Sequence, residues 1–352
     1  MALLARMIYA PLSLDIGPGA IAGLHGLLAE GGISRGGKVA VLVGSGQGEE
    51  IEKALRGTLD SADFVRVTSA SIEHARDLAA TLQPSSYDAV VGIGGGRTLD
   101  VAKYIASVVA LPMVAVATNL AHDGLASPVA SLEYAGRKGS YGVHIPVAVI
   151  VDLDYVQRSP HRMLVAGVGD VVSNLSALAD WKLAAEVRSE RVDGIAAAFA
   201  RSAAEAVIGR TDSVESTEFI TVLAEALVLS GLSMAVAGSS RPCSGGDHEI
   251  LHAIDQLYPG TSNHGELAGL GALFCAHLRD DDVHAHAIDT CLRRHGLPRS
   301  PLDVGLTVEQ FVAAVELAPS TRPDRYTILE HLDLSHGAIE TQVEKFLATI
   351  GE

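Results

Sequence analysis

Residues 87–103 read YDAVVGIGGGRTLDVAK, and this stretch decides the fold. An apolar, β-branched run ends in consecutive glycines, and TLDVAK then begins a segment whose apolar residues recur at helical spacing. A strand that passes through a tight glycine turn into a helix is the repeating unit of parallel α/β sheets. The stretch therefore predicts a strand over Tyr87–Gly96 followed by a crossover helix.

The same alternation of strand and helix continues on both sides, up to about residue 158. Further strands are expected over Lys38–Gly46, Asp63–Ser69, Met113–Thr118 and Val147–Val156. After about Pro160 the β-branched runs disappear, and long helical patterns replace them. A chain of 352 residues fits two domains of ordinary size. We therefore expect an α/β domain with a parallel sheet over 1–158 and an all-helical domain over 159–352.

Composition and charge narrow the classes of partner. A net charge of −16 disfavours nucleic acids and anionic membranes, which would need a basic face. No uninterrupted apolar run reaches the roughly 18 residues of a membrane span, and the start, MALLARMIYAPLSLDIG, meets Pro11 and Asp15 before any signal-like core. Cys243, Cys275 and Cys291 are odd in number and lack CxxC spacing, so the sequence supports neither a disulfide framework nor a thiolate zinc site. A cytoplasmic protein without a membrane or nucleic-acid partner is expected.

The glycine turn GIGGGRT, residues 92–98, follows a strand and opens a helix. Glycines let the backbone approach a phosphate, and the amide groups at a helix start attract negative charge. The spacing differs from G-x-G-x-x-G, so the turn indicates either a nucleotide diphosphate site or a ligand-free connection. Asp100 and Lys103 are explained as charges on the solvated face of the helix that follows.

A second polar segment, ATNLAHDGLASP at 117–128, follows the next expected strand. Ligands of open α/β sheets bind outside the carboxyl ends of the strands, so this loop and the glycine turn should line one crevice. Thr118 and Ser127 can hydrogen-bond a cofactor, and Asp123 can accept hydrogen bonds from substrate hydroxyls. The same Asp and Ser also suit ordinary side-chain turns, and the sequence leaves both interpretations open.

Three segments of the helical domain carry metal-ligand residue types. Asp170 lies in GVGDVVSN, where we expect it early in a helix, His248 and His252 lie in GGDHEILHAID, and His264 lies in SNHGELAGLG. One carboxylate and two imidazoles suit a zinc-like ion with positions left for a substrate oxygen or water; nickel and iron(II) accept the same donors. His248 and His252 share one helix face, so the spacing allows either one to be the ligand.

Taken together, these motifs resemble the glycerol-1-phosphate dehydrogenase branch of the iron-containing alcohol dehydrogenase and dehydroquinate synthase superfamily. The resemblance runs from about Asp88 to Gly271, in the order GGGRTLDVAK, HDGLASPVAS, AGVGDVVSNLSALADWKLA, GSSRP, DHEILHAID and HGELAGLG. It implies a dehydroquinate synthase-like fold, with a dinucleotide-binding α/β domain and a helical domain that binds zinc. It also implies a homo-oligomer, a role in phospholipid biosynthesis, and NAD(P)H-linked reduction of dihydroxyacetone phosphate to sn-glycerol 1-phosphate.

The resemblance also implies the role of each matching residue. Asp123 would contact substrate, Asp170 would bind both metal and substrate, and His252 would lie against the substrate as a proton-relay group. The metal would be held by Asp170, His248 and His264. The NAD or NADP cofactor would contact Gly94, Gly95, Gly96, Arg97, Thr98, Thr118, Ala121 and Ser127. Positive charge near the substrate is sought among Arg97, Lys138 and Arg241.

Departures from the family pattern bear on specificity. The family tends to place proline and serine where this chain has Ala117 and Ala121, and Asn119 and Leu120 are also unusual. The hydroxyl missing at position 121 leaves the choice of cofactor and the exact substrate open. Alternatives are therefore a dehydrogenase for another polyol or for a phosphorylated or phosphonate ketone, a carbocycle-forming synthase related to dehydroquinate synthase, and a noncatalytic protein that has kept the fold.

Overall fold

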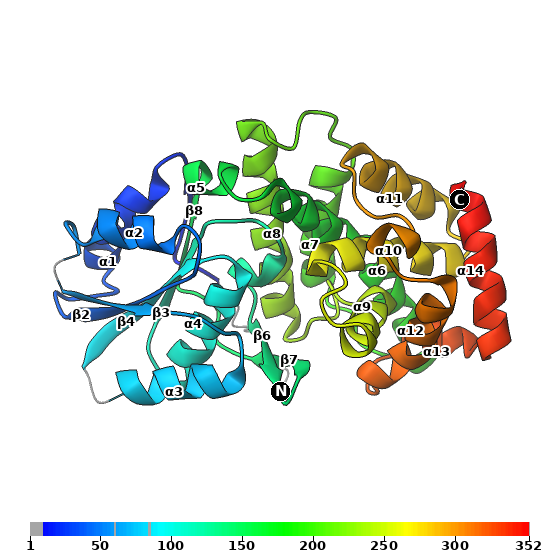
Figure 1. Ribbon diagram of the computed structural model, residues 1–352, viewed down its shortest axis with the longest axis horizontal. Helices are drawn as coiled ribbons and strands as arrows, with labels where there is room; N and C mark the ends of the chain where they lie inside the picture. The colour runs from blue at the N-terminus through cyan, green and yellow to red at the C-terminus, as the bar shows by residue number, and fades with distance from the viewer. Residues whose placement is uncertain (1–9, 60, 84–85, 352) are drawn as a thin grey trace, which may run out of the picture. The chain divides into compact units, whose positions relative to one another are not determined.

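The computed structural model describes residues 10–59, 61–83 and 86–351 (Figure 1). Residues 1–9, which include the part of the amino-terminal segment examined for a signal, lie outside this range. The chain divides into two compact units. The first comprises residues up to Asn119 together with Gly124–Ser159, and the second comprises Leu120–Asp123 together with Pro160–Glu352.

The first unit is built on a parallel sheet of six strands in the order β1-β8-β5-β4-β2-β3. Its strands are β1 (Ser13–Gly17), β2 (Lys38–Val43), β3 (Ala62–Arg66), β4 (Tyr87–Gly94), β5 (Met113–Ala117) and β8 (Ala148–Asp152). Its longer helices are α1 (Leu24–Glu30), α2 (Gly48–Leu55), α3 (Ile72–Leu82) and α4 (Gly96–Val108). The order of the strands reverses at β2, so the crevice expected at a topological switch point lies between β2 and β4.

Apolar residues cover both faces of the sheet, as the continuous β-branched runs predict. Alternate residues of β2, Val39, Val41 and Val43, belong to a core cluster that also contains Leu28 of α1 and Ile51 of α2. Helices α3 and α4 pack against each other, and α4 contacts β4. The predicted α/β fold class with a parallel sheet is confirmed.

The first unit differs from the sequence expectation at three places. Residues Leu153–Gln157 form helix α5, not the end of a strand, because the side chain of Asp152 caps the amides of Asp154 and Tyr155. Gly96 likewise begins α4 and does not end β4. The third difference is an unexpected antiparallel hairpin of β6 (Val129–Tyr134) and β7 (Arg137–Gly142). Its two-residue turn, Ala135 and Gly136, has positive φ at both positions, which is typical of tight hairpins.

Among its described residues, the second unit has only helices as regular secondary structure, as predicted. Its helices are α6 (His161–Arg188), α7 (Gly194–Ile208), α8 (Thr217–Ala237), α9 (Gly246–Leu257), α10 (His264–Leu278), α11 (Asp282–Arg294), α12 (Val308–Thr321), α13 (Ile328–Leu332) and α14 (His336–Ile350). Helix α6 is central, since it packs against α7, α8, α9, α10 and α11. The short segment Leu120–Asp123 joins this unit because it packs on α6.

Two helices, α6 and α8, are long and apolar enough to cross a membrane by length and composition. In this structure 89% of the apolar stretch of α6 and 67% of that of α8 are buried. Burial against neighbouring helices accounts for their apolar composition, as in the core helices of globular domains.

Candidate active site

The glycine turn of the first unit connects β4 to α4. A Cβ at Gly94 would collide with the side chain of Thr98, and a Cβ at Gly95 would collide with the side-chain amide of Asn119. The loop after β5 is fixed to this turn because the Thr118 amide donates to the Gly94 carbonyl over 3.1 Å. Gly95 is the N-cap of α4 and no side chain caps the helix, so its first amides suit an anionic group.

The residues predicted to bind the cofactor have different environments. Gly94, Thr98 and Thr118 are buried around the turn, whereas Arg97 is exposed. The Ser127 hydroxyl is buried and donates to the Val129 carbonyl over 3.1 Å. Ala121 is half-buried in the segment that belongs to the second unit.

The interpretation of Asp100 and Lys103 as solvated charges is wrong. Lys103 is 0% exposed, and its ammonium lies 2.9 Å from Asp100 Oδ1. The ammonium also donates to the Gly124 carbonyl over 2.6 Å, to the Ser127 hydroxyl over 3.3 Å and to the Val129 carbonyl. Lys103 therefore holds the 124–129 segment onto α4, and the buried charge is balanced by protein oxygens.

In the second unit, Asp170, His248 and His264 converge. One ligand atom from each of these residues lies within 4.8 Å of the others. His264 Nε2 is 3.5 Å from Asp170 Oδ1, and His248 Nε2 is 3.9 Å from the same oxygen. The rings of His248 and His264 have centroids 5.1 Å apart. Three side chains from three separate helices thus present one carboxylate and two imidazoles to a common point.

Glycines bring the helices of this cluster together. A Cβ at Gly169 of α6 would collide with the Gly265 carbonyl, and a Cβ at Gly265 of α10 would collide with the Ala166 carbonyl. The two backbones are therefore in contact where Asp170 and His264 emerge. Gly167 in the same way lets the Leu120 carbonyl approach α6. Close backbone approach, which only glycine permits, sets the spacing of the cluster.

Asp170 is buried in the tenth position of α6, not early in a helix as expected, because α6 begins at His161. Its Oδ2 accepts a hydrogen bond from the Asp123 amide over 2.9 Å. Burial, and then the negative charge of Asp123, raise the pKa of the Asp170 carboxyl to about 8. A buried carboxylate in this position calls for a positive charge beside it.

Asp247 orients His248 and was missed by the sequence argument. Its Oδ2 lies 2.5 Å from His248 Nδ1, while its Oδ1 accepts from the Gly245 amide over 3.2 Å. A carboxylate on Nδ1 places the ring proton there and leaves Nε2 as the donor atom for a metal. Burial would lower the pKa of His248, but the charge and hydrogen bond of Asp247 raise it overall.

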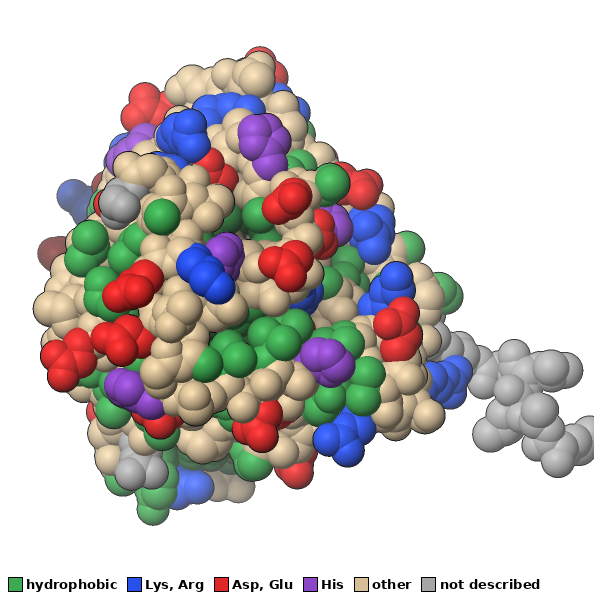
Figure 2. Space-filling view, turned by 90° about the vertical axis from the view of Figure 1, so that its right-hand side faces the viewer, with side chains coloured by type: hydrophobic (Ala, Val, Ile, Leu, Met, Phe, Trp, Pro, Cys, Tyr) green, Lys and Arg blue, Asp and Glu red, His purple; other side chains and the backbone are tan. Residues whose placement is uncertain are grey.

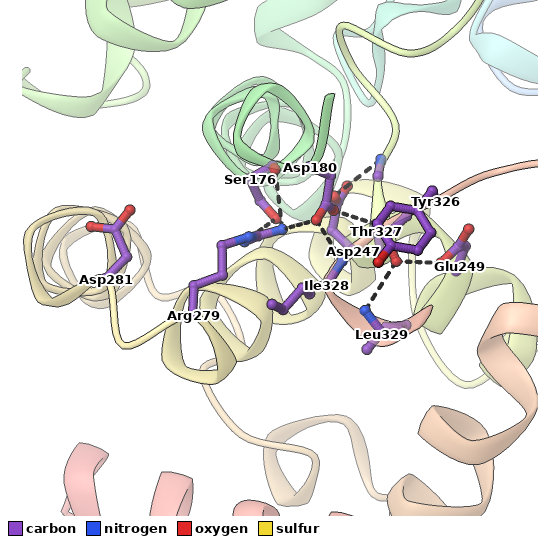
Figure 3. A network of polar contacts seen from close by, with 12 residues as sticks. Ser176, Asp180, Asp247, Glu249, Arg279, Asp281, Tyr326, Thr327, Ile328 and Leu329 are labelled. Atoms are coloured by element: carbon purple, nitrogen blue, oxygen red, sulfur yellow. Dashed lines mark hydrogen bonds and ion pairs between the residues drawn. The ribbon is translucent and has the colours of Figure 1, made fainter. Parts of the chain in front are cut away.

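A buried network of polar contacts around Asp180 supports the segment that carries Asp247 and His248 (Figure 3). Asp180 accepts from the Gly246 amide over 2.8 Å and from the Ile328 amide over 2.8 Å, and it pairs with Arg279 at 2.5 Å. The start of α9, which carries Asp247 and His248, is thereby fixed to α6, α10 and α13. Proteins use such buried polar networks to hold functional groups rigidly.

The two histidines of the HxxxH pair have different surroundings. His248 belongs to the cluster, whereas the His252 ring lies 6.4 Å from the His248 ring and its Nε2 is 2.9 Å from Arg322 Nη2. His122, next to Asp123, stacks edge-on against His264 with centroids 5.8 Å apart. Arg322 was not considered in the sequence argument, because no motif marks it.

The candidates for positive charge near the substrate lie in different environments. Arg241 is buried, but both oxygens of Glu190 bind its guanidinium, at 2.7 and 2.5 Å, so its charge is neutralised locally. Lys138, in β7, is exposed. Arg322, which is not one of these candidates, lies beside His252, a residue expected to contact substrate.

The cluster fits a divalent cation. Its donors are those that zinc prefers, and Asp247 sets the tautomer of His248. Burial and the charge of Asp123 disfavour the ionised form of Asp170, and a bound cation would stabilise that form. Two imidazoles and one carboxylate do not distinguish zinc from nickel or iron(II).

Comparison with known proteins agrees with the fold and the motifs. The iron-containing alcohol dehydrogenase family matches residues 15–160. A glycerol-1-phosphate dehydrogenase [NAD(P)+] of Hyperthermus butylicus is 36% identical over 95% of this chain and 96% of its own length. The corresponding enzyme of Thermofilum pendens is 38% identical over 93% of this chain and 94% of its own.

Among solved structures, a probable glycerol dehydrogenase from Sinorhizobium meliloti superposes with a TM-score of 0.81. It is 23% identical and covers 99% of both chains, so it supports the fold alone. The sequence-based assignment to the glycerol-1-phosphate dehydrogenase branch is confirmed by the relatives at higher identity.

Proposed function

The chain belongs to the glycerol-1-phosphate dehydrogenases of the iron-containing alcohol dehydrogenase family, and we propose that it interconverts dihydroxyacetone phosphate and sn-glycerol 1-phosphate. In the direction of reduction, a hydride from NADH or NADPH adds to the ketone carbon. The carbonyl electron pair moves to oxygen, and a proton completes the new hydroxyl. The observation that supports this function most directly is the convergence of Asp170, His248 and His264 within 4.8 Å.

Asp170, His248 and His264 would hold the divalent cation, with zinc as the expected ion. When bound, this cation supplies Lewis-acid polarisation of the ketone oxygen. Asp247 would keep His248 Nε2 available by holding the proton on Nδ1. The segment at Asp123 is fixed to Asp170 through its amide, so the Asp123 carboxylate would orient the substrate hydroxyls by accepting their hydrogen bonds.

His252 would relay the proton that completes the hydroxyl, itself or through a water chain. An arginine can only donate, so the contact from Arg322 makes His252 Nε2 an acceptor and places the N–H of the neutral ring on Nδ1. In the first unit, the amides of the turn from Gly94 to Thr98, with the loop at Thr118, would bind the cofactor diphosphate. Ala121 and Ser127 remain cofactor contacts in this proposal.

The decisive test follows oxidation of NADH and NADPH with dihydroxyacetone phosphate, dihydroxyacetone and glyceraldehyde 3-phosphate. Activity on dihydroxyacetone phosphate should disappear on chelation and return with added zinc. The product should be the sn-1 enantiomer, which an enantiospecific enzymatic assay identifies. A fully metallated protein that is inactive on dihydroxyacetone phosphate would refute the proposal.

We also infer a cytoplasmic homo-oligomer that acts on a small molecule and makes precursors of phospholipids. The three cysteines are buried and free, as suits a reducing compartment. Acidic and basic side chains are interspersed on the face drawn in Figure 2, which suits a soluble enzyme more than a nucleic-acid-binding protein. Light scattering during size-exclusion chromatography measures the number of subunits, and a monomer would contradict this inference.

A further inference from the structure

Arg322 is the first residue after α12, whose carboxyl end lies against α9. Its guanidinium is half-buried, and Nη2 is 2.9 Å from Nε2 of His252. His252 projects one turn beyond His248 on the same face of α9. A strong cationic group is therefore in direct contact with a residue that the proposed function places against substrate.

A row of imidazoles connects Arg322 to the metal cluster. From the His252 ring, the centroid of His248 is 6.4 Å away, and from His248 the centroid of His264 is 5.1 Å away. In dihydroxyacetone phosphate, a single CH₂–O link separates the ketone carbon from phosphorus. A substrate with its ketone oxygen at the cluster is therefore short enough for its phosphate to lie close to the cluster, and the region beyond His248, toward His252 and Arg322, is one place where it can lie.

Positive charge is concentrated around this position in an otherwise acidic chain. Arg325 donates to the Ser240 hydroxyl over 2.9 Å and also to the Ser244 carbonyl. Burial, and then the charges of Arg322 and Arg241, lower the pKa of Arg325 to about 10. Burial also lowers the pKa of Arg322, and Glu249 offsets this in part. The charge of Arg322 disfavours that of Arg325, although Glu249 and Asp247 offset this in part, so an anion bound beside the two guanidinium groups would be stabilised.

We propose that Arg322 binds the phosphate group of the substrate. This inference rests on the proposed function and names the group by which the enzyme selects phosphorylated ketones. A guanidinium presents five N–H donors in a planar fork, so contact with His252 and with phosphate oxygens is compatible. Arginine suits this role better than lysine because the fork matches two phosphate oxygens at once.

The test compares two substrates that differ only in the phosphate. For Arg322→Gln, kcat/KM for dihydroxyacetone phosphate should fall about 100-fold, the size expected when a charge-assisted hydrogen bond is lost. The loss for dihydroxyacetone should be at least about tenfold smaller, because that substrate lacks the recognised group. Arg322→Lys should recover part of the preference. Equal losses on the two substrates, or no loss on the phosphorylated one, would overturn the assignment.

A matched control and a binding measurement separate this inference from the function itself. Arg294→Gln removes another arginine of the same unit, one that donates to the Ile208 and Arg210 carbonyls, and it should keep the substrate preference. Inorganic phosphate is titrated by calorimetry with NAD+ saturating. Wild type and Arg294→Gln should bind it, and Arg322→Gln should bind at least about tenfold more weakly.

The two ways of failing are distinguishable. If wild type reduces no ketone but binds inorganic phosphate in an Arg322-dependent way, the proposed function fails and the phosphate site stands. If wild type reduces dihydroxyacetone phosphate and phosphate binding is the same in the Arg322 variants, the function stands and the phosphate site is wrong. Circular dichroism shows whether each variant is folded. If Arg322→Gln is not folded, the same comparison is made with Arg322→Lys.

Discussion

Each unit of the chain buries a charged cluster, and the two clusters are balanced differently. In the first unit the Lys103 ammonium is surrounded by Asp100 and by the oxygens of residues 124, 127 and 129. In the second unit, Asp170 accepts one hydrogen bond from a backbone amide, and burial together with the charge of Asp123 raises the pKa of its carboxyl to about 8. The first cluster is complete within the chain and holds a loop in place. The second calls for a cation from outside, which is the physical signature of a binding site.

The largest effect is expected from removing the carboxylate of the second cluster. Asp170→Asn keeps the size of the side chain but removes the charge that the cation requires. Metal content should fall to background, and kcat/KM should fall at least about 10⁴-fold, since metal stabilisation of a developing alkoxide contributes several kcal/mol.

The folded state of this variant should be retained, because the substitution removes a buried charge. His295→Gln is the control, since His295 is a buried histidine of the same unit that packs on Phe219. Atomic absorption on the purified proteins and steady-state kinetics make the measurement. An Asp170→Asn protein that retains stoichiometric metal would contradict the comparison.

The first cluster should respond in stability. Lys103→Met removes the ammonium and leaves Asp100 buried without its counter-charge, which should lower the free energy of unfolding by about 3 kcal/mol. The double variant with Asp100→Asn should recover part of this loss. Lys182→Met is the control, because Lys182 is 78% exposed in its pair with Glu186. Urea denaturation gives the values, and equal losses in the two lysine variants would show that burial does not matter here.

The two sites also differ in how far the sequence could predict them. The glycine turn is one contiguous stretch in which strand, turn and helix follow each other, so residues 87–103 indicate both the fold and a phosphate-binding turn. The metal cluster joins segments at 123, 170, 248 and 264. Residue types and family order brought them together in the prediction, but spacing alone left His248 and His252 equivalent. Only the contacts of each ring separate them.

What the sequence could not predict depends on burial and on tertiary contact. The sequence predicts a surface charge at Lys103 because nothing in the pattern of α4 indicates the 124–129 segment that covers it. Asp247 precedes His248 and is a helix-start residue by pattern, yet its carboxylate contacts the ring. Arg322 belongs to no motif. The hairpin of β6 and β7 was missed because its turn, Ala135 and Gly136, is not one of the strong turn dipeptides.

A smaller effect on metal binding is expected from Asp247→Asn. The amide would present a donor to His248 Nδ1, so the ring proton would tend to move to Nε2, the atom that must be unprotonated to bind metal. Metal affinity should weaken about 10- to 100-fold. Glu249→Gln is the matched control. Glu249 follows His248 in the sequence and is as buried as Asp247, but its carboxylate contacts Thr327. Competition with a chromogenic chelator gives the dissociation constants, and equal values in both variants would leave Asp247 without a positioning role.

The last expected effect is a slope of stability against pH in the chelated protein. With a pKa of about 8 in the folded state and an ordinary value of 3.8 in the unfolded chain, Asp170 holds an extra proton in the folded state between these pH values. Stability should therefore fall as pH rises from about 4 to about 8, by at most about 1.4 kcal/mol per pH unit from this group. His248 and Glu249, whose pKa values are also raised, act in the same direction, so the comparison is with Asp170→Asn under the same conditions.

The Asp170→Asn variant should have a shallower slope of stability against pH than wild type. Added zinc should flatten the wild-type curve, because the cation keeps Asp170 ionised in the folded state. Parallel slopes for wild type and variant would mean that the chain itself balances Asp170, and the contrast between the two buried clusters would be lost.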